Sequence, residues 1–271
     1  MSSQPPLQAI PVIIPFYRER EKLSRCLQHL RAQSYAPLEI FVRDNTDDNI
    51  YFTAAVNEGL RKFCYDDAIP YVVILNQDAY LAPNAIQVLA EFLAQEPKSG
   101  IAAPIQLTAQ GTVTWGGSWA AFPTGVHRSA PLETFTTPFE TYWANGAALM
   151  VRTEVVREVG LWDRNYRFIC SDADFSFTAR TRGWKVHVVP EARCTHDLSS
   201  SGTDMNLELE RIKLADLLYF AMKWPSGDLY RELSCEGRTL TEPKVRQDVE
   251  RIKRALNNVQ QKIDAAQPPK V

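Results

Sequence analysis

Residues 9–20 read AIPVIIPFYRER, so an apolar run passes directly into a group of polar and charged side chains. The run at 9–15 has the length and the Ile and Val content of a strand that is buried on both faces of a sheet. After it, apolar side chains recur at the i, i+3, i+4, i+7 spacing of an amphipathic helix. These side chains are Leu23, Cys26, Leu27 and Leu30. A buried strand that leads into such a helix is the first half of a parallel βαβ unit.

The same alternation continues outward from this segment through the first hundred residues. Short apolar runs predict strands at 38–42, 71–75 and 101–107. Helical spacing of apolar side chains lies between them, from Phe52 to Phe63 and from Ile86 to Leu93. Strands and helices that alternate in this way imply right-handed crossovers and helices on both faces of the sheet. We therefore expect an α/β fold with a mostly parallel sheet flanked by helices.

The pattern changes after residue 110. Residues 111–145 are rich in Thr, Gly, Pro and aromatic residues and carry no helical stripe, which is typical of strands and long loops over a site. Regular patterns then return as a strand, a helix, a strand and two further helices, at 146–151, 174–182, 185–189, 206–223 and 243–265. The expected parts are the first half of one domain, its second half and a C-terminal helical extension, at 1–110, 111–205 and 206–271.

The last predicted helix carries a heptad repeat of apolar residues. Their spacing of 4, 3, 4, 3, 4 forms the seam by which one helix packs along another. The residues are Val245, Val249, Ile252, Leu256, Val259 and Ile263. The partner helix lies either in the same chain or, across a two-fold axis, in a homodimer, and the sequence leaves both open.

Composition narrows the class of protein. A chain of 271 residues that is 45% hydrophobic can bury a substantial core. The chain has 30 Lys and Arg residues and 32 Asp and Glu residues, so its net charge is -2. This charge does not indicate a general nucleic-acid-binding protein. The apolar runs fall far short of the roughly 20 residues that span a bilayer. Five cysteines form no CxxC pair and residues 1–8 lack the features of a signal peptide, so we expect reduced thiols and a cytoplasmic protein.

Polar side chains follow each of the first three predicted strands. They read FYRER at 16–20, RDN at 43–45 and NQD at 76–78. Ligands bind at the carboxyl ends of the strands in an open parallel sheet. No GxGxxG or GxxxxGK[ST] motif occurs, which excludes the dinucleotide fingerprint and the P-loop. Any one of these carboxylates is more often a cap or turn residue, but three polar strand ends together predict a site for a polar ligand.

Nine short motifs resemble those of the family 2 nucleotide-sugar glycosyltransferases, in that family's order and approximate spacing. They are VIIPFYR (12–18), FVRDN (41–45), AAVNEGL (54–60), ILNQDA (74–79), NGAALMVR (145–152), VGLWD (159–163), SDADFS (171–176), RGWKV (182–186) and VPEARCTH (189–196). Together they cover roughly residues 10–200 and leave out the C-terminal extension. The resemblance implies the GT-A fold, built on a Rossmann-like sheet. It also implies an inverting transfer of a sugar from a nucleoside-diphosphate sugar.

The resemblance assigns residues to the nucleotide-sugar donor. The family's base-reading acid corresponds to Asp44, which can accept a hydrogen bond from the imide N–H of uracil or thymine. NQDA at 76–79 is similar to the DQDS of bacterial rhamnosyltransferases, which points toward a dTDP-linked sugar, with a UDP-linked sugar as the other pyrimidine option. Asn57 in its N-x-G element either contacts the donor or closes a helix. The implied donor-binding residues are Pro15, Tyr17, Asp44, Asn45, Asn57, Asn76 and Asp78.

A divalent cation, Mn²⁺ or Mg²⁺, is expected beside the donor. The leaving diphosphate gains negative charge as the glycosidic bond breaks, and a hard cation with oxygen ligands stabilises that charge. By the resemblance, Asp78 is the ligand from the DxD-type motif and His196 is a second ligand. Asn76 stands at the first acidic position of that motif and brings no charge, so we expect modest affinity for the metal.

The acceptor needs a base, because a sugar hydroxyl is too weakly acidic to attack unaided. The family's E-D-x-D motif places the base at Asp172, with Ser171 in the position of the Glu. A helix N-terminus keeps such a carboxylate ionised, although simple capping is the alternative. Asp174 and Trp143 are predicted to contact the acceptor. Their alternatives are a structural role for Asp174 and core packing for Trp143.

Two other functions stay open at this point. A nucleotidyltransferase shares the topology and the need for metal, but it usually has a Gly-rich loop where this chain has PFYRER at 15–20. A non-catalytic sugar-binding protein is favoured by Asn76 and Ser171, which replace acids of the family. For the transferase we expect a saccharide or lipid-linked acceptor from cell-wall or polysaccharide biosynthesis. A lipid-linked acceptor would bring peripheral contact with the inner face of the membrane.

Overall fold

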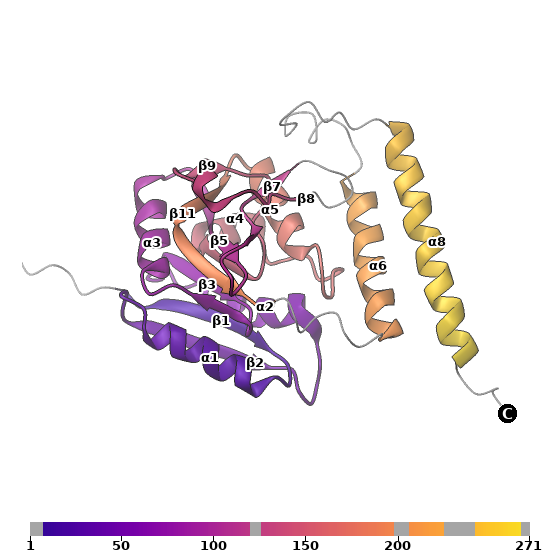
Figure 1. Ribbon diagram of the computed structural model, residues 1–271, viewed down its shortest axis with the longest axis horizontal. Helices are drawn as coiled ribbons and strands as arrows, with labels where there is room; N and C mark the ends of the chain where they lie inside the picture. Colours follow the sequence, from indigo (N-terminus) through magenta and orange to yellow (C-terminus); the bar gives the residue numbers. More distant parts are fainter. Residues whose placement is uncertain (1–7, 120–125, 198–205, 225–241, 267–271) are drawn as a thin grey trace, which may run out of the picture.

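The computed structural model describes residues 8–119, 126–197, 206–224 and 242–266. Within these ranges a nine-stranded sheet has the order β2-β1-β3-β10-β5-β11-β4, with β6 beside β5 and β9 beside β11. Helices cover both of its faces (Figure 1). The α/β architecture predicted from the alternation of strands and helices is confirmed.

The strands of the main sheet are β1 (Ile10–Phe16), β2 (Leu38–Asp44), β3 (Tyr71–Leu75), β4 (Ala79–Leu81), β5 (Ser99–Leu107), β6 (Val113–Trp115), β9 (Phe139–Glu140), β10 (Ala148–Arg152) and β11 (Lys185–His196). A separate hairpin consists of β7 (Ser118–Trp119) and β8 (Val126–His127). The helices are α1 (Arg20–Arg31), α2 (Tyr51–Phe63), α3 (Ala85–Gln95), α4 (Thr153–Val159), α5 (Ser171–Thr181), α6 (Leu207–Lys223) and α8 (Glu242–Ala266).

The sheet is mostly parallel, as the sequence predicts. β1 pairs in parallel with both β2 and β3, and β5 pairs in parallel with β11. β10 lies antiparallel between β3 and β5, and β4 lies antiparallel to β11. The carboxyl ends of β1 and β3 therefore meet at one edge, where the polar segments after these strands come together.

β1 is buried on both faces because its alternate residues enter two different cores. Ile13 packs with α2 on one face, and Ile14 packs with Cys26 and Leu30 of α1 on the other. Gly59 lets α2 approach closely, since a Cβ at this position would lie 2.5 Å from Cγ1 of Ile13. The glycine of the N-x-G element therefore serves the packing of α2 on the sheet.

Two boundaries differ from the sequence prediction. β11 continues to His196, beyond the predicted end of this strand at residue 189, so His196 belongs to the strand itself. Polar residues interrupt its apolar pattern, and its pairing with β5 shifts register between Val189 and Arg193. α5 begins at Ser171, before the predicted start, because Ser and Asp at a helix N-terminus break an apolar stripe.

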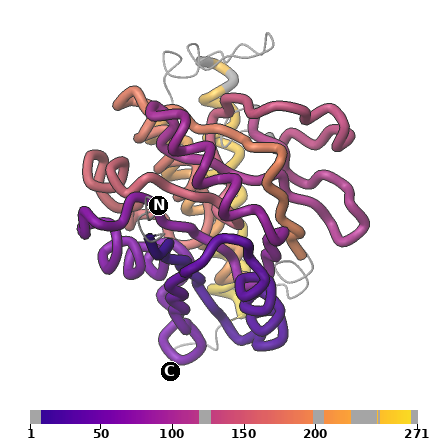
Figure 2. The backbone as a smooth tube through the Cα atoms, turned by 90° about the vertical axis from the view of Figure 1, so that its left-hand side faces the viewer, coloured from indigo at the N-terminus to yellow at the C-terminus, as the bar shows by residue number. Residues whose placement is uncertain are grey.

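α8 packs along α6 at one side of the molecule (Figure 1). Val245, Ile252 and Val259 of the heptad seam are buried. Of the two partners that the sequence left open, the structure shows a helix of the same chain. Figure 2 turns the molecule so that α8, in yellow, lies behind the domain. In the described ranges, no helix combines the length and the apolar character that a membrane span requires.

Candidate active site

A cavity of about 770 Å³ opens at the carboxyl ends of β1 and β3. Its other walls come from the segments before α2 and α5, the end of β11 and the first turn of α6. Eight of the predicted site residues line it: Pro15, Tyr17, Asn45, Asn76, Asp78, Trp143, Asp172 and His196. Three others, Asp44, Asn57 and Asp174, are not among its lining residues.

The turn after β1 is held by Gln77. Its Oε1 accepts a hydrogen bond from the backbone N–H of Tyr17 at 2.6 Å, and its Nε2 donates to the carbonyl of Tyr17 and to Glu19 Oε2, each at 3.2 Å. The amide thus satisfies both backbone groups of Tyr17, whose ring stays partly exposed at the cavity. Gln77 carries no charge and lies between two motif residues, so this positioning role could not be predicted from the sequence.

Asn45, not its neighbour Asp44, faces the cavity. Asp44 is exposed, and its pKa is lowered by the side chain of Thr46 and by the backbone N–H of Thr46, which donates to Oδ1 at 2.8 Å. Asn45 is buried and accepts from Nη1 of Arg43 at 2.9 Å. The sequence predicts that Asp44 reads the nucleotide base. In the structure, Asp44 lies at the outer side of the end of β2.

Asn57 is buried between α2 and the segment before α5. Its Nδ2 donates to the carbonyl of Trp162 at 2.8 Å and its Oδ1 accepts from Trp162 N at 3.0 Å. Both ends of the amide are occupied by one backbone position, so Asn57 joins two parts of the chain. This placement favours the structural alternative over contact with the donor.

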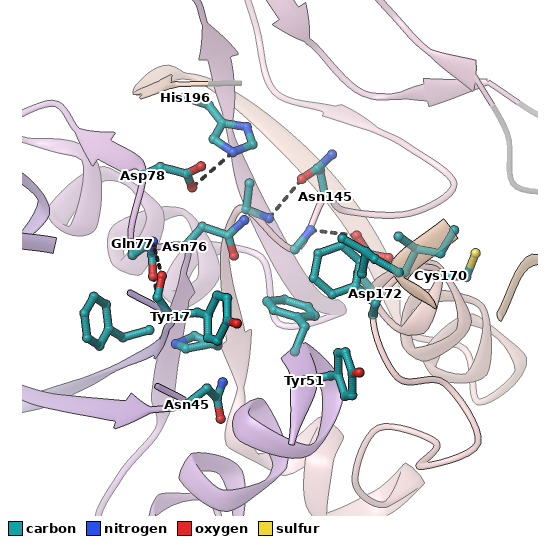
Figure 3. A pocket seen from close by; sticks show the side chains of 18 of the residues that line it. Tyr17, Asn45, Tyr51, Asn76, Gln77, Asp78, Asn145, Cys170, Asp172 and His196 are labelled. Carbon is teal, nitrogen blue, oxygen red and sulfur yellow. Dashed lines mark hydrogen bonds and ion pairs between the residues drawn. The ribbon is translucent and has the colours of Figure 1, made fainter. Parts of the chain in front are cut away.

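Asp78 and His196 lie together at one end of the cavity (Figure 3). Asp78 follows β3, His196 ends β11, and their Oδ1 and Nε2 atoms are 3.4 Å apart. No set of three or more His, Cys, Asp or Glu side chains converges in the described part of the chain. A carboxylate oxygen and an imidazole nitrogen on one side of a cavity fit a divalent cation that takes its remaining ligands from the substrate.

Asp172 lies at another wall of the same cavity, in the first turn of α5 (Figure 3). Its Oδ2 accepts from Gly146 N and its Oδ1 accepts from Ala173 N, each at 2.8 Å. Burial raises the pKa of Asp172 and outweighs these two hydrogen bonds, which lower it. Glycine at residue 146 leaves room for this contact, because a Cβ there would lie only 3.3 Å from Asp172 Oδ2 and 3.1 Å from Phe52.

Asp174 is only 2% exposed and points away from the cavity into a cluster with α6. Its carboxylate accepts from Tyr166 Oη at 3.0 Å and Trp224 Nε1 at 2.8 Å, and it forms an ion pair with Lys223 Nζ at 2.9 Å. The predicted contact with an acceptor does not agree with this placement. The structural alternative does, because Asp174 joins α5 to the end of α6.

His127 lines the cavity and was missed from the sequence. Its ring lies 5.5 Å from that of Trp143, which is itself mostly buried. Burial lowers the pKa of His127, and the nearby carboxylate of Asp172 opposes that shift. A lone His in a segment without periodicity carries no sequence signal, so only the fold reveals this neighbour of Asp172.

Backbone strain gathers around the cavity. Among the described residues, Arg18, Tyr51 and Cys170 have positive φ angles without being glycine, at 62°, 64° and 68°. All three line the cavity. Such conformations cost about 1–3 kcal/mol each and persist where the surroundings fix them, often at functional sites.

Comparison with known proteins identifies the family. A profile described as "Glycosyl transferase family group 2" matches residues 71–224, more than half of the chain. The chain belongs to the family 2 glycosyltransferases. The predicted family is thereby confirmed, and six of the nine motifs lie within the matched residues. Membership of this family does not support the nucleotidyltransferase alternative. The match also extends beyond those motifs to the end of α6.

One relative known by function is also informative. N-acetylglucosaminyl-diphospho-decaprenol L-rhamnosyltransferase of Mycobacterium tuberculosis is 24% identical over 242 residues, which covers 72% of this chain and 78% of the relative. The same protein from a second strain of that species matches equally. This glycosyltransferase thus has a relative that acts in the rhamnosylation of a lipid-linked saccharide.

Two solved structures share the fold. GalNAc-T7, crystallised with UDP, GalNAc and Mn²⁺, superposes with a TM-score of 0.57 at 13% identity, over 91% of this chain and 55% of that one. TarS of S. aureus gives a TM-score of 0.55 at 14% identity, over 93% of this chain and 43% of that one. The glycosyltransferase spans about half the length of these proteins or less. The predicted GT-A fold is confirmed.

Proposed function

We propose that this glycosyltransferase moves a deoxyhexose, with inversion, from a dTDP-linked donor to a saccharide carried on a lipid diphosphate, with a UDP-linked sugar as the alternative donor. The observation that carries the proposal is that Asp172 and the Asp78–His196 pair line a single cavity at the sheet edge. One end of that cavity offers ligands for a diphosphate-bound cation, and the other offers a base. The rhamnosyltransferase named above supports the choice of sugar and acceptor.

At the donor end, Asp78 and His196 would hold a Mn²⁺ or Mg²⁺ ion together with oxygens of the diphosphate. The ion supplies positive charge that stabilises the leaving group. Asn76, which lines the cavity beside this pair, offers an amide in place of a second carboxylate. Pro15 and Tyr17 form the wall against which the pyrimidine would lie, and Gln77 fixes that wall through the backbone of Tyr17.

At the acceptor end, Asp172 would take the proton of the attacking hydroxyl as the new glycosidic bond forms. Each carboxylate oxygen accepts one backbone N–H, so each keeps a lone pair for the acceptor. The raised pKa of Asp172 makes it a better base than an exposed aspartate. Attack on the side of the anomeric carbon opposite the diphosphate gives inversion in one displacement.

The acceptor saccharide would lie beside Trp143 and His127, which line the cavity near Asp172. An aromatic face packs well on the C–H surface of a sugar, and a neutral imidazole can donate or accept a hydrogen bond to a hydroxyl. Phe168, Ile169 and Leu209 add an apolar wall on the side of α6. A lipid-linked acceptor would bring the enzyme to a membrane surface during cell-wall or polysaccharide synthesis.

The test is an assay of transfer with a panel of donors and acceptors. dTDP-linked and UDP-linked sugars are incubated with lipid-diphosphate saccharides and Mn²⁺ or Mg²⁺, and the released nucleotide and the product are identified. We expect nucleoside diphosphate and a product with inverted anomeric configuration by NMR. Retention of configuration overturns the mechanism. The absence of release with every donor favours the non-catalytic sugar-binding alternative.

A further inference from the structure

The segment that leads into the proposed base is tied to α6 by a buried carboxylate. Asp216, near the middle of α6, is 2% exposed. Its Oδ1 accepts from the backbone N–H of Arg167 at 3.0 Å, and its Oδ2 accepts from those of Phe168 and Ile169 at 2.7 and 2.9 Å. One side chain of α6, far along the sequence, thus accepts hydrogen bonds from three successive backbone N–H groups.

This segment forms a wall of the cavity and then becomes the first turn of α5. Phe168, Ile169 and Cys170 all line the cavity. Cys170 takes the left-handed conformation that turns the chain into α5, and Asp172 follows two residues later. Any shift of residues 167–169 is therefore passed through one strained turn to the position of Asp172.

The other side of the segment is held by α2. The carbonyl of Arg167 accepts from Thr53 N at 3.2 Å, and the hydroxyl of Thr53 donates to that of Ser171 at 2.9 Å. Ser171 occupies the position of the family's Glu, and here it serves this buried contact. The segment is thus held between α2 and α6, and Asp216 is the charged side chain that holds it on the side of α6.

Helix packing alone does not explain a buried carboxylate in the middle of α6, because Leu or Ala would be more favourable at such a position. Burial raises the pKa of Asp216, and the three backbone hydrogen bonds oppose that shift. Backbone N–H groups of an irregular segment need acceptors when they are buried, and Asp216 supplies them from outside the segment. The role of the carboxylate is therefore to bind the segment before α5 and not to pack α6 against its neighbours.

We propose that Asp216 is a positioning residue for catalysis, which acts through residues 167–170 on the location of Asp172. The inference rests on the proposed role of Asp172 as base. It makes α6, which carries none of the nine motifs, part of the machinery for acceptor attack. Asp216 does not touch substrate and its effect on the reaction is exerted through the segment it binds.

The central experiment compares Asp216→Asn with Glu210→Gln, which makes the same change at an exposed carboxylate of the same helix. An Asn amide offers one acceptor oxygen and one N–H₂ group, so at least one of the three backbone donors meets another donor. We expect kcat to fall about 10- to 100-fold in Asp216→Asn, since small misplacements of catalytic groups have effects of this size. The Kd for nucleoside diphosphate with Mn²⁺ should stay within about twofold, as for an interaction used only in the chemical step.

A second readout reports the segment itself. Cys170 is 6% exposed, and loosening of its turn should speed alkylation of this thiol by iodoacetamide, followed residue by residue by mass spectrometry. Glu210→Gln should match the wild type in both measurements. Asp216→Ala, which removes both acceptor oxygens and so all three hydrogen bonds, should show larger effects, and Asp216→Asn keeps the test valid if the alanine variant does not fold.

The outcomes separate this inference from the function on which it rests. Normal kcat and normal protection of Cys170 in a folded Asp216→Asn variant overturn the inference. Equal losses of kcat and nucleotide affinity also overturn it, because they indicate general damage to the fold. Full turnover in Asp172→Asn overturns the proposed base instead, whatever Asp216→Asn does. An inactive Asp172→Asn with a fully active Asp216→Asn leaves the proposed function intact and rejects only the positioning role.

Discussion

The two walls of the cavity are built by different means. The wall proposed to bind the donor, here called the donor wall, lies at the ends of β1 and β3, whose parallel pairing fixes their relative positions, and consists of Pro15, Tyr17, Asn76 and Asp78. The wall proposed to face the acceptor, here called the acceptor wall, consists of residues 168–172. It has no strand to hold it and depends on side chains from α2 and α6. A sheet edge positions ligand-binding groups through its backbone, whereas an irregular wall needs buried polar side chains to satisfy and locate it.

The largest expected effect separates chemistry from binding. Asp172→Asn keeps the shape of the side chain and removes its basicity, so kcat should fall by about 10²–10⁴, the usual contribution of a general base. The Kd for donor nucleotide, measured by calorimetry, should change little because the donor wall does not include Asp172. An equal loss of donor binding would show that the two walls are not independent.

The next effect concerns the support of the acceptor wall. Lys223→Ala removes the cation that pairs with buried Asp174 at 2.9 Å. The free energy of unfolding should fall by about 1–3 kcal/mol, below the range for a fully buried ion pair, because Lys223 is 31% exposed and Asp174 keeps its hydrogen bonds from Tyr166 and Trp224. Chemical denaturation measures this change, with Lys262→Ala on exposed α8 surface as the matched control. Equal stability of the two variants would contradict the structural role of Asp174.

A smaller effect is expected at the predicted metal ligands Asp78 and His196. Asp78→Asn or His196→Ala removes one of two predicted ligands for the cation, so donor nucleotide should bind at least about tenfold more weakly in Mn²⁺. Chelation of divalent ions in the wild type should have the same effect. Binding that does not depend on metal or on either substitution would reject the Asp78–His196 site.

The mildest change is in the pH profile. Burial raises the pKa of Asp172 above its ordinary value, and the ionised form is the active base, so activity is present above that pKa and is lost as pH falls through it. The acidic limb of kcat against pH should therefore lie above the ordinary aspartate pKa of about 3.9. A limb at or below that value would mean that Asp172 is not the group observed.

The same difference between the walls decided what the sequence could predict. Apolar runs locate β1 and β3, so the motif residues at their ends were placed correctly at the cavity. The sequence does not distinguish Asp44 from Asn45, although one step along the chain turns a side chain to the other side of a strand and only Asn45 lines the cavity. Asp174 lies two residues after Asp172 in the motif, but its partner Lys223 is 49 residues away in the sequence. No local pattern predicts such a contact. Gln77 and Asp216 act on backbone groups, which leave no periodic signal.

The left-handed turn at Cys170 sets a limit for engineering this enzyme. Cys170→Gly would relieve the unfavourable backbone conformation, but it would also free the turn that carries Asp172, since glycine restricts the chain least. Relief of the backbone conformation at this position would thus come with a loss of turnover. Library designs that aim at both properties should leave residue 170 fixed and seek their gains on the outer surface of α8.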